Sequence, residues 1–381
     1  MEGSGWEKRP LAELRAWLAL AHSPGGGSVA LARRLCGGLD PAQLLTARGR
    51  LPGIDLPPRL KAYLAEPDWA GVDRDLAWAE QPGNHVVTLA DSAYPPLLRE
   101  TVGPPLLLFV HGRPATLALP QLAIVGSRNP TEGGRRTTRD FAAHLAGAGI
   151  VVTSGLALGI DAAAHEGALE AGGLTVAVTG TGLDRVYPAR HRELAHRIAD
   201  AGALVSEFPP GTPPTPANFP RRNRIVSGLA LGTLVTEASL QSGSLITARL
   251  ATEQGREVFA IPGSIHNPLA RGCHALIRQG AKLVETAQDI IDELPALLGH
   301  LALGEAGERT VAAGADDTTG LAKEHRHLLD LMGFDPVSPD ELASRSGWGI
   351  AQVSSTLLLL ELQGWVSSQL GGRYCRLTRS A

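Results

Sequence analysis

The feature that most constrains the fold is a pattern repeated through the middle of the chain: a short apolar run, a turn, and a stretch with helical period. Seven such runs occur, and helical stretches of roughly ten to fifteen residues separate most of them. Short strands that are apolar on both faces and alternate with helices indicate a parallel sheet covered on both sides. The sequence therefore predicts an α/β fold with a doubly wound, mostly parallel sheet. The predicted strands are Leu122–Val125, Ile150–Thr153, Thr175–Val178, Ala203–Ser206, Thr233–Thr236, Val258–Ile261 and Lys282–Val284.

Glycine-rich turns follow the first two predicted strands, at Gly126-Ser127-Arg128 and at Ser154–Gly159. In doubly wound sheets, ligands bind beyond the carboxyl ends of the strands, where these turns would lie. The backbone amides and the dipole of a helix that begins there attract an anion, and Arg128 would add a full positive charge. These turns predict an anion-binding site.

A second cationic feature is the stretch Asn218–Leu229, which contains Arg221, Arg222 and Arg224. No acidic residue occurs in residues 208–236, so the local charge is +3 in a chain whose net charge is -3. The planar fork of an arginine side chain fits phosphate oxygens, and several forks on one helical turn form an anion-binding surface. A chain with a negative net charge needs such a local patch to bind nucleic acid. The patch and the glycine turns together predict a site that grips a phosphate backbone.

Several common chemistries are excluded or disfavoured by what the sequence lacks. The four lysines, at positions 8, 61, 282 and 323, never follow a glycine, so no Walker A loop is present. Cys36, Cys273 and Cys375 form no C-x-x-C pair, and no H-E-x-x-H occurs. This pattern favours a reducing compartment and argues against a zinc site or a disulfide framework. We expect neither a metal nor a cofactor.

The location of the protein is predicted from its hydropathy. No apolar run reaches the roughly 18 residues that a membrane span needs, and the N-terminus lacks a basic-then-apolar signal pattern. With 44% hydrophobic and 19% charged residues, the composition is typical of a globular protein. We therefore expect a cytoplasmic protein without a membrane partner.

Before the sheet, residues 1–89 are predicted to form a small helical module of sterile-alpha-motif or helix-hairpin-helix type. Asp40-Pro41 has the N-cap and first-turn chemistry of a helix start. Leu51–Ile54 could be the hairpin of a helix-hairpin-helix, whose backbone amides touch DNA phosphates, or a plain turn before the next helix. The sheet domain would then occupy residues 90–295.

After the sheet, residues 296–322 show neither helical nor strand period and are interpreted as a linker. Residues 323–381 predict a compact unit with a helix ending near Gly333, a capped helix from Ser338, and a third helix over Gly349–Leu362. Two short strands would follow around Gly371-Gly372. This order of elements is typical of a winged helix-turn-helix.

The motifs of the central region occur together in a specific combination and order. They are Ala123–Arg128, Thr153–Asp161, Thr179–Asp184 with Tyr187-Pro188, Asn218–Leu229, Glu237-Ala238 with Ser242–Ala248, and Val258–Gly263. With this set the chain closely resembles the DNA-processing protein A family (DprA, also called Smf). The resemblance implies an extended Rossmann-like domain that binds single-stranded DNA as a homodimer. It also implies that the protein protects incoming DNA and loads RecA recombinase onto it in natural transformation.

The resemblance further implies which residues touch the DNA. The expected phosphate contacts are Gly126, Ser127, Arg128, Ser154, Gly155, Arg221, Arg222, Asn223, Arg224, Ser242, Gly243 and Ser244. For the homodimer interface we consider Leu269, Leu276 and Ile277, which are apolar at near-helical spacing. A buried helix uses the same spacing, so these three residues could equally be ordinary core.

A competing interpretation is an enzyme, because Rossmann-like nucleotide phosphoribohydrolases carry a similar P-G-G-x-G-T-x-x-E loop. The related stretch here, Leu231–Glu237, lacks the Pro-Gly-Gly and has an extra residue before the Glu. Glu237 could be a general base or a structural carboxylate, and we expect it to be buried beside Arg222 or Arg224. We therefore expect a DNA-binding protein with no catalytic residue.

A third interpretation is a transcription factor that reads DNA with its winged helix. Residues 323–381 hold six Lys or Arg and six Asp or Glu, and the predicted recognition helix has no Lys or Arg. Sequence-reading helices use such side chains for phosphate and base contacts. A protein-docking or weakly DNA-contacting module fits this composition better.

Overall fold

The computed structural model describes residues 10–24, 29–49, 56–294, 323–332, 337–362, 365–369 and 373–376. The chain divides into two compact units, Met1–Gly304 and Glu305–Ala381. Within the described residues, no helix combines the length and the apolar character that crossing a bilayer requires.

The first unit begins with five short helices. They are α1 (Leu11–Ala21), α2 (Val29–Cys36), α3 (Pro41–Thr46), α4 (Pro58–Ala65) and α5 (Trp69–Ala79). The predicted helix start at Asp40-Pro41 is confirmed, because the Asp40 carboxylate accepts a hydrogen bond from the Ala42 backbone N–H at 2.9 Å. The candidate hairpin at Leu51–Ile54 lies outside the described residues.

The predicted boundary at residue 89 does not separate the helices from the sheet. Residues 84–88 form strand β1 (Asn84–Thr88), which pairs antiparallel with β2 (Leu107–Gly112). The helices also share a core with these strands, and the Trp78 ring of α5 meets Phe109 of β2 edge-on at 5.6 Å between centroids. The prediction missed both strands because β1 has only two consecutive valines and β2 follows a proline-rich connection.

A nine-stranded sheet forms the centre of the unit, in the order β1-β2-β6-β5-β4-β3-β7-β8-β9. Strands β3 to β9 run parallel to one another, and β2 joins β6 antiparallel. All seven predicted strands are confirmed to within one residue at each end. They are β3 (Gln121–Val125), β4 (Val151–Ser154), β5 (Thr175–Val178), β6 (Ala203–Ser206), β7 (Gly232–Val235), β8 (Glu257–Ala260) and β9 (Lys282–Leu283).

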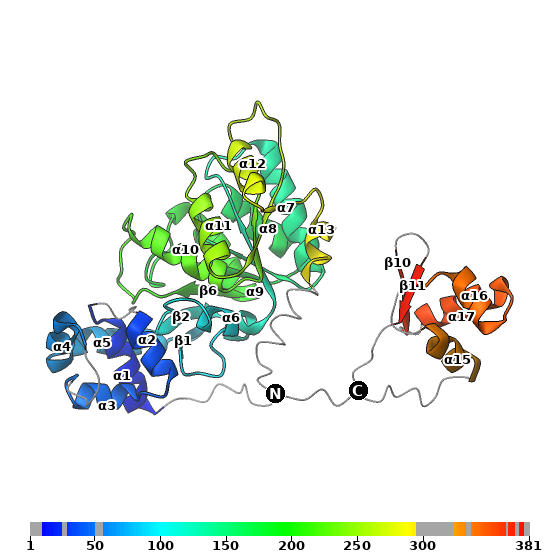
Figure 1. The fold of residues 1–381 in the computed structure, drawn as a ribbon. Coiled ribbons are helices and arrows are strands. Elements are labelled where there is room, and N and C mark those ends of the chain that lie inside the picture. The colour runs from blue at the N-terminus through cyan, green and yellow to red at the C-terminus, as the bar shows by residue number, and fades with distance from the viewer. Residues whose placement is uncertain are drawn as a thin grey trace. The chain divides into compact units, whose positions relative to one another are not determined.

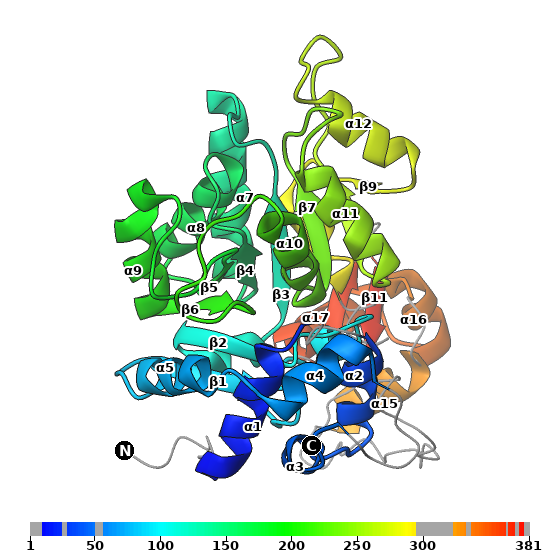
Figure 2. The same ribbon diagram turned by 90° about the vertical axis from the view of Figure 1, so that its left-hand side faces the viewer.

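Helices cover both faces of the sheet (Figures 1 and 2). Strand β3 shows why, since Leu122 and Ile124 enter one buried cluster while Ala123 and Val125 enter another. One face carries α7 (Glu132–Gly147), α8 (Ile160–Glu170), α9 (Arg192–Ala201) and α13 (Ala287–Ile291). The opposite face carries α10 (Asn218–Gly228), α11 (Ser244–Glu253) and α12 (Arg271–Arg278).

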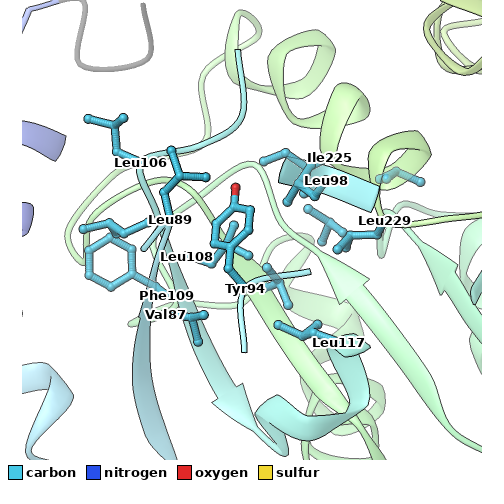
Figure 3. Close-up of a cluster of buried hydrophobic side chains, with 14 of the residues drawn as sticks. Val87, Leu89, Tyr94, Leu98, Leu106, Leu108, Phe109, Leu117, Ile225 and Leu229 are labelled. Atoms are coloured by element: carbon cyan, nitrogen blue, oxygen red, sulfur yellow. The ribbon is translucent and has the colours of Figure 1, made fainter. Parts of the chain in front are cut away.

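A buried cluster fixes α10 against the antiparallel side of the sheet (Figure 3). Leu98, on the short helix α6 (Pro96–Arg99), lies beside Ile225 and Leu229 at the C-terminal part of α10. Tyr94 is fully buried in the same cluster, and its hydroxyl donates to the Pro105 carbonyl at 2.8 Å. This packing holds the helix that carries the arginine stretch.

The second unit has the predicted winged-helix order of three helices and two strands. The elements are α15 (Lys323–Met332), α16 (Pro339–Ser346), α17 (Ile350–Leu362), β10 (Val366–Gln369) and β11 (Arg373–Arg376). The expected cap at Ser338 is present, because its hydroxyl accepts the Glu341 N–H while the Glu341 carboxylate accepts the Ser338 N–H. The turn at Gly371-Gly372 and the linker over residues 296–322 lie outside the described residues.

Candidate nucleic-acid interface

A cavity of about 640 Å³ opens at the carboxyl ends of the parallel strands. It lies where the strand order reverses, because β3 has β4 on one side and β7 on the other. This is the position at which doubly wound sheets bind ligands. Nine of the twelve predicted phosphate contacts line it: Gly126, Ser127, Arg128, Gly155, Arg222, Asn223, Ser242, Gly243 and Ser244.

The loop after β3 places an exposed arginine at the mouth of the cavity. Gly126 is required there, because a Cβ would lie 2.7 Å from the Ile160 side chain and 2.8 Å from the Glu237 carbonyl. The Ser127 N–H donates to that same carbonyl at 2.6 Å, which ties this loop to the end of β7. Arg128 then extends over the Phe219 ring, 5.7 Å from its centroid. Arg128 also lines the cavity, and it forms no ion pair with an acidic residue in the part of the chain that the structure describes.

Arg222 supplies a second positive charge from the wall of the cavity. It is only 4% exposed, and one terminal nitrogen donates to the Val178 carbonyl at 2.6 Å. Burial lowers the pKa of Arg222, the nearby Asp161 carboxylate raises it, and Arg128 lowers it again. Its Nε has no hydrogen-bond partner among the described residues. An anion between the two guanidinium groups would relieve their repulsion and offset the burial cost.

The third wall of the cavity is the N-terminus of α11. Ser242 and the N-cap Gly243 lead into the helix, Ser244 is its first residue, and the two serine hydroxyls lie 2.6 Å apart. The first N–H groups of this helix have acceptors, since Leu245 donates to the Ser242 carbonyl and Ile246 to the Gly243 carbonyl, each at 3.1 Å. The helix dipole nevertheless makes that end partly positive. This end of the ten-residue helix therefore attracts the same kind of ligand as the arginines.

Two aromatic rings at the cavity were not predicted as site residues. Tyr187 and Phe219 lie 5.7 Å apart between ring centroids, and both line a smaller recess of about 70 Å³ that also borders Arg128 and Arg222. The sequence does carry a signal for them, since the chain has only four Tyr and six Phe and both rings fall inside the shared motifs. Aromatic faces beside cations are suited to stacking nucleobases.

The structure does not bring Ser154 into the cavity. Its side chain is fully buried, and its hydroxyl donates to the Ile124 carbonyl at 2.6 Å. Ser154 is the last residue of β4, so its side chain projects from a buried face of the sheet rather than from the following turn. Its neighbour Gly155 does line the cavity.

Arg221 and Arg224 also lie away from the cavity. Both pair with the buried carboxylate of Glu207, and Arg224 in addition donates to the Gly103 carbonyl at 2.9 Å. A helix turns by about 100° per residue, so Arg221 and Arg224 share a face that Arg222 does not. The expected charge of +3 is therefore partly neutralised inside the protein.

Glu237 is buried, as expected, but its predicted arginine partners are wrong. Its two carboxylate oxygens accept hydrogen bonds from the Thr131 N–H at 2.8 Å and the Thr131 hydroxyl at 2.7 Å. Asn267 donates a longer bond of 3.5 Å. Because Thr131 caps α7, the carboxylate joins the end of β7 to the start of that helix. These contacts hold the Thr131 cap of α7 in place.

Comparison with known proteins agrees with this architecture. The chain matches the family of DNA recombination-mediator protein A over residues 85–295 and the DprA winged helix domain over residues 312–372. The chain belongs to this family. Protein Smf of Escherichia coli (strain K12) is 45% identical over 310 residues, which cover 81% of this chain and 82% of that protein. DNA processing protein DprA of Streptococcus pneumoniae is 46% identical over 206 residues, 54% of this chain and 73% of that one.

Two solved structures of the DprA family resemble this chain. DprA from Streptococcus pneumoniae superposes with a TM-score of 0.64 at 37% identity, over 73% of this chain and 95% of that one. DNA processing protein A from Helicobacter pylori, whose structure was described for its single-stranded DNA binding mode, gives a TM-score of 0.51 at 31% identity. That match covers 56% of this chain and 96% of the other. The predicted family and its Rossmann-like and winged-helix architecture are confirmed.

Proposed function

We propose that this protein binds single-stranded DNA by its phosphate backbone in the cavity at the strand ends. The observation that carries the proposal is the convergence of Arg128, buried Arg222 and the N-terminus of α11 on one space beside two aromatic rings. The cations would hold phosphates and the rings would stack bases without reading their sequence. The single-stranded DNA binding described for the Helicobacter pylori relative supports this assignment.

Family membership supports a proposal for the wider role. We infer that the protein protects single-stranded DNA entering the cytoplasm in natural transformation and loads RecA recombinase onto it. A homodimer is part of this proposal, with Leu269, Leu276 and Ile277 as interface candidates. Leu276 and Ile277 are half-buried and pack against the core of the first unit, which leaves part of each side chain for a partner copy. Light scattering on the purified protein measures this state directly.

The enzyme interpretation has less support at this site. A general base needs a carboxylate oxygen directed at the substrate. Both oxygens of Glu237 instead accept hydrogen bonds from Thr131, and the carboxylate is buried. A DNA-binding function requires nothing of Glu237 beyond holding its loop in place.

The proposal is tested by the salt dependence of oligo-dT binding. Each neutralised phosphate contributes a slope of about -0.7 to the log–log dependence of affinity on salt, so Arg128→Ala should weaken binding and make the slope shallower by about 0.7. Arg249→Ala is the matched control, because Arg249 is an exposed arginine of α11 that pairs with Glu253 away from the cavity. Equal affinity and slope in Arg128→Ala and the wild type would contradict the proposal.

A further inference from the structure

A second cationic pocket lies on the other side of the loop that borders the first cavity. We propose that it holds a further phosphate of the same DNA strand, so that the strand crosses the loop Leu183–Ala189. This inference rests on the proposed function. It adds a stretch of surface that none of the predicted phosphate contacts includes.

The pocket has a volume of about 320 Å³ and is built from four elements. Strand β2 contributes His111 and strand β6 contributes Leu204. Helix α9 contributes Arg192 and His196, which lie four residues apart and so share one helical face. The loop that follows β5 closes the remaining side.

The charge of the pocket is positive. Asp184, the acidic residue in its lining, is held by Arg185 at 2.8 Å and accepts a hydrogen bond from the Gly211 N–H at 2.7 Å. Arg192, by contrast, is exposed and has no acidic partner among the described residues. One uncompensated guanidinium in a concave site favours an anion, and its fork fits phosphate oxygens.

The His111 ring also lines this pocket. Burial lowers the pKa of His111, and the neighbouring His196 lowers it further, while Asp200 raises it. The His111 ring is therefore neutral near pH 7. Arg192 is accordingly the residue whose removal should matter most at that pH.

The loop Leu183–Ala189 borders both sites, so a strand bound in both would cross this loop. Tyr187 and Pro188 line the recess beside Arg128, while Val186 and Ala189, their neighbours in the chain, line the second pocket. Tyr187 is 48% exposed. A cation, an aromatic ring and a second cation in sequence match the alternation of phosphate and base along a single strand.

The test compares short and long DNA on the full-length protein. Oligo-dT of about 4 nucleotides should reach only the first cavity, while about 16 nucleotides should span both, the limits of typical site sizes on single-strand-binding domains. Arg192→Ala should leave the short oligomer unaffected. It should weaken the long one severalfold and make its salt slope shallower by about 0.7.

Arg197→Ala is the matched control, because Arg197 is an exposed arginine of the same helix that does not line the pocket. Arg192→Glu should weaken long-oligomer binding further than Arg192→Ala. Wild-type binding of the long oligomer by both Arg192 variants overturns the inference. If Arg128→Ala still weakens both oligomers, the proposed function stands without the second pocket; if Arg128→Ala is also without effect, both fail.

Discussion

The Arg222 guanidinium occupies the space that a side chain at Gly155 would fill. A Cβ at Gly155 would overlap Nη1 of Arg222, while that nitrogen is held by the Val178 carbonyl at 2.6 Å. The glycine turn after β4 therefore determines where the buried charge sits in the cavity wall. An alanine there has to displace the guanidinium or move the turn.

Gly155→Ala should accordingly weaken oligo-dT binding by tenfold or more, about 1.4 kcal/mol. The reason is that Arg222 would lose its position in the cavity wall, and a buried charge cannot move without losing its hydrogen bond. Fluorescence anisotropy with labelled oligo-dT measures the change. Gly147→Ala is the control, because a Cβ at Gly147 of α7 meets nothing within 4 Å. Wild-type affinity in Gly155→Ala would refute this account of the turn.

The strands and turns could be predicted because their causes are local. Doubly apolar runs such as Thr175–Val178 gave the strand positions, and the cap at Ser338 could be read from four consecutive residues. The placement of Arg128 beside the cavity followed from a glycine turn after a strand. In these cases neighbouring residues alone determine the backbone.

The directions of the arginines and of Glu237 could not be predicted, because their partners are distant in sequence. Glu237 binds Thr131, 106 residues away. Arg224 binds Gly103 at a separation of 121 residues. Charge alone suggested that Glu237 would pair with an arginine, but the fold places the capping residue of α7 nearer to it. Whether Glu237 pairs with Thr131 or with an arginine therefore depends on the three-dimensional arrangement of the chain.

The stability of the first unit should fall in mild acid because of His165. This ring is fully buried, its Nδ1 contacts the Thr175 hydroxyl at 2.7 Å, and its Nε2 has no partner among the described residues. Burial, with smaller effects of His191 and Arg222, lowers the pKa of His165 to about 3. The unfolded ring takes up a proton near pH 6.5 while the folded ring does not. The contribution of the neutral His165 ring to the free energy of unfolding is therefore complete above pH 6.5 and is lost as the pH falls toward 3.

Between pH 7 and pH 5 the His165 contribution should decrease by about 2 kcal/mol. His165→Gln should remove that part of the pH dependence, whatever its effect on stability at pH 7. Urea unfolding at the two pH values measures the difference. His266→Gln, at an exposed position, should keep the wild-type pH dependence. An identical loss in wild type and His165→Gln would assign the acid sensitivity to other groups.

Removing residues 323–381 should leave oligo-dT affinity nearly unchanged. The helix expected to read DNA, α17, exposes Ile350 and Leu359, each 47% accessible, and carries neither Lys nor Arg. Such a surface suits contact with a protein better than contact with phosphates. Binding of the truncated chain to oligo-dT, compared with the full chain at the same salt concentration, tests this expectation. A loss of tenfold or more, about 1.4 kcal/mol, would show that the winged helix supplies main contacts.

Glu237→Gln distinguishes the structural role of this carboxylate from a catalytic one. A glutamine keeps one acceptor for the Thr131 N–H but replaces charge-assisted hydrogen bonds by neutral ones, so the free energy of unfolding should fall by roughly 1 kcal/mol. Glu237→Ala, which leaves that N–H without its acceptor, should cost about 1–3 kcal/mol. Oligo-dT affinity should change little in Glu237→Gln, because the carboxylate does not line the cavity.

The same variants decide between DNA binding and nucleotide hydrolysis. Wild-type protein and Glu237→Gln should both release no free base from nucleoside monophosphates, as followed by chromatography of the products. Arg128→Ala serves as the positive control for the binding assay, since it should weaken oligo-dT binding while the Thr131 contacts stay intact. Base release by the wild type that disappears in Glu237→Gln, together with normal folding of the variant, would assign the cavity to a phosphoribohydrolase. We expect no base release because both oxygens of the Glu237 carboxylate accept hydrogen bonds from Thr131, the N-cap of α7, and so are not available to activate water.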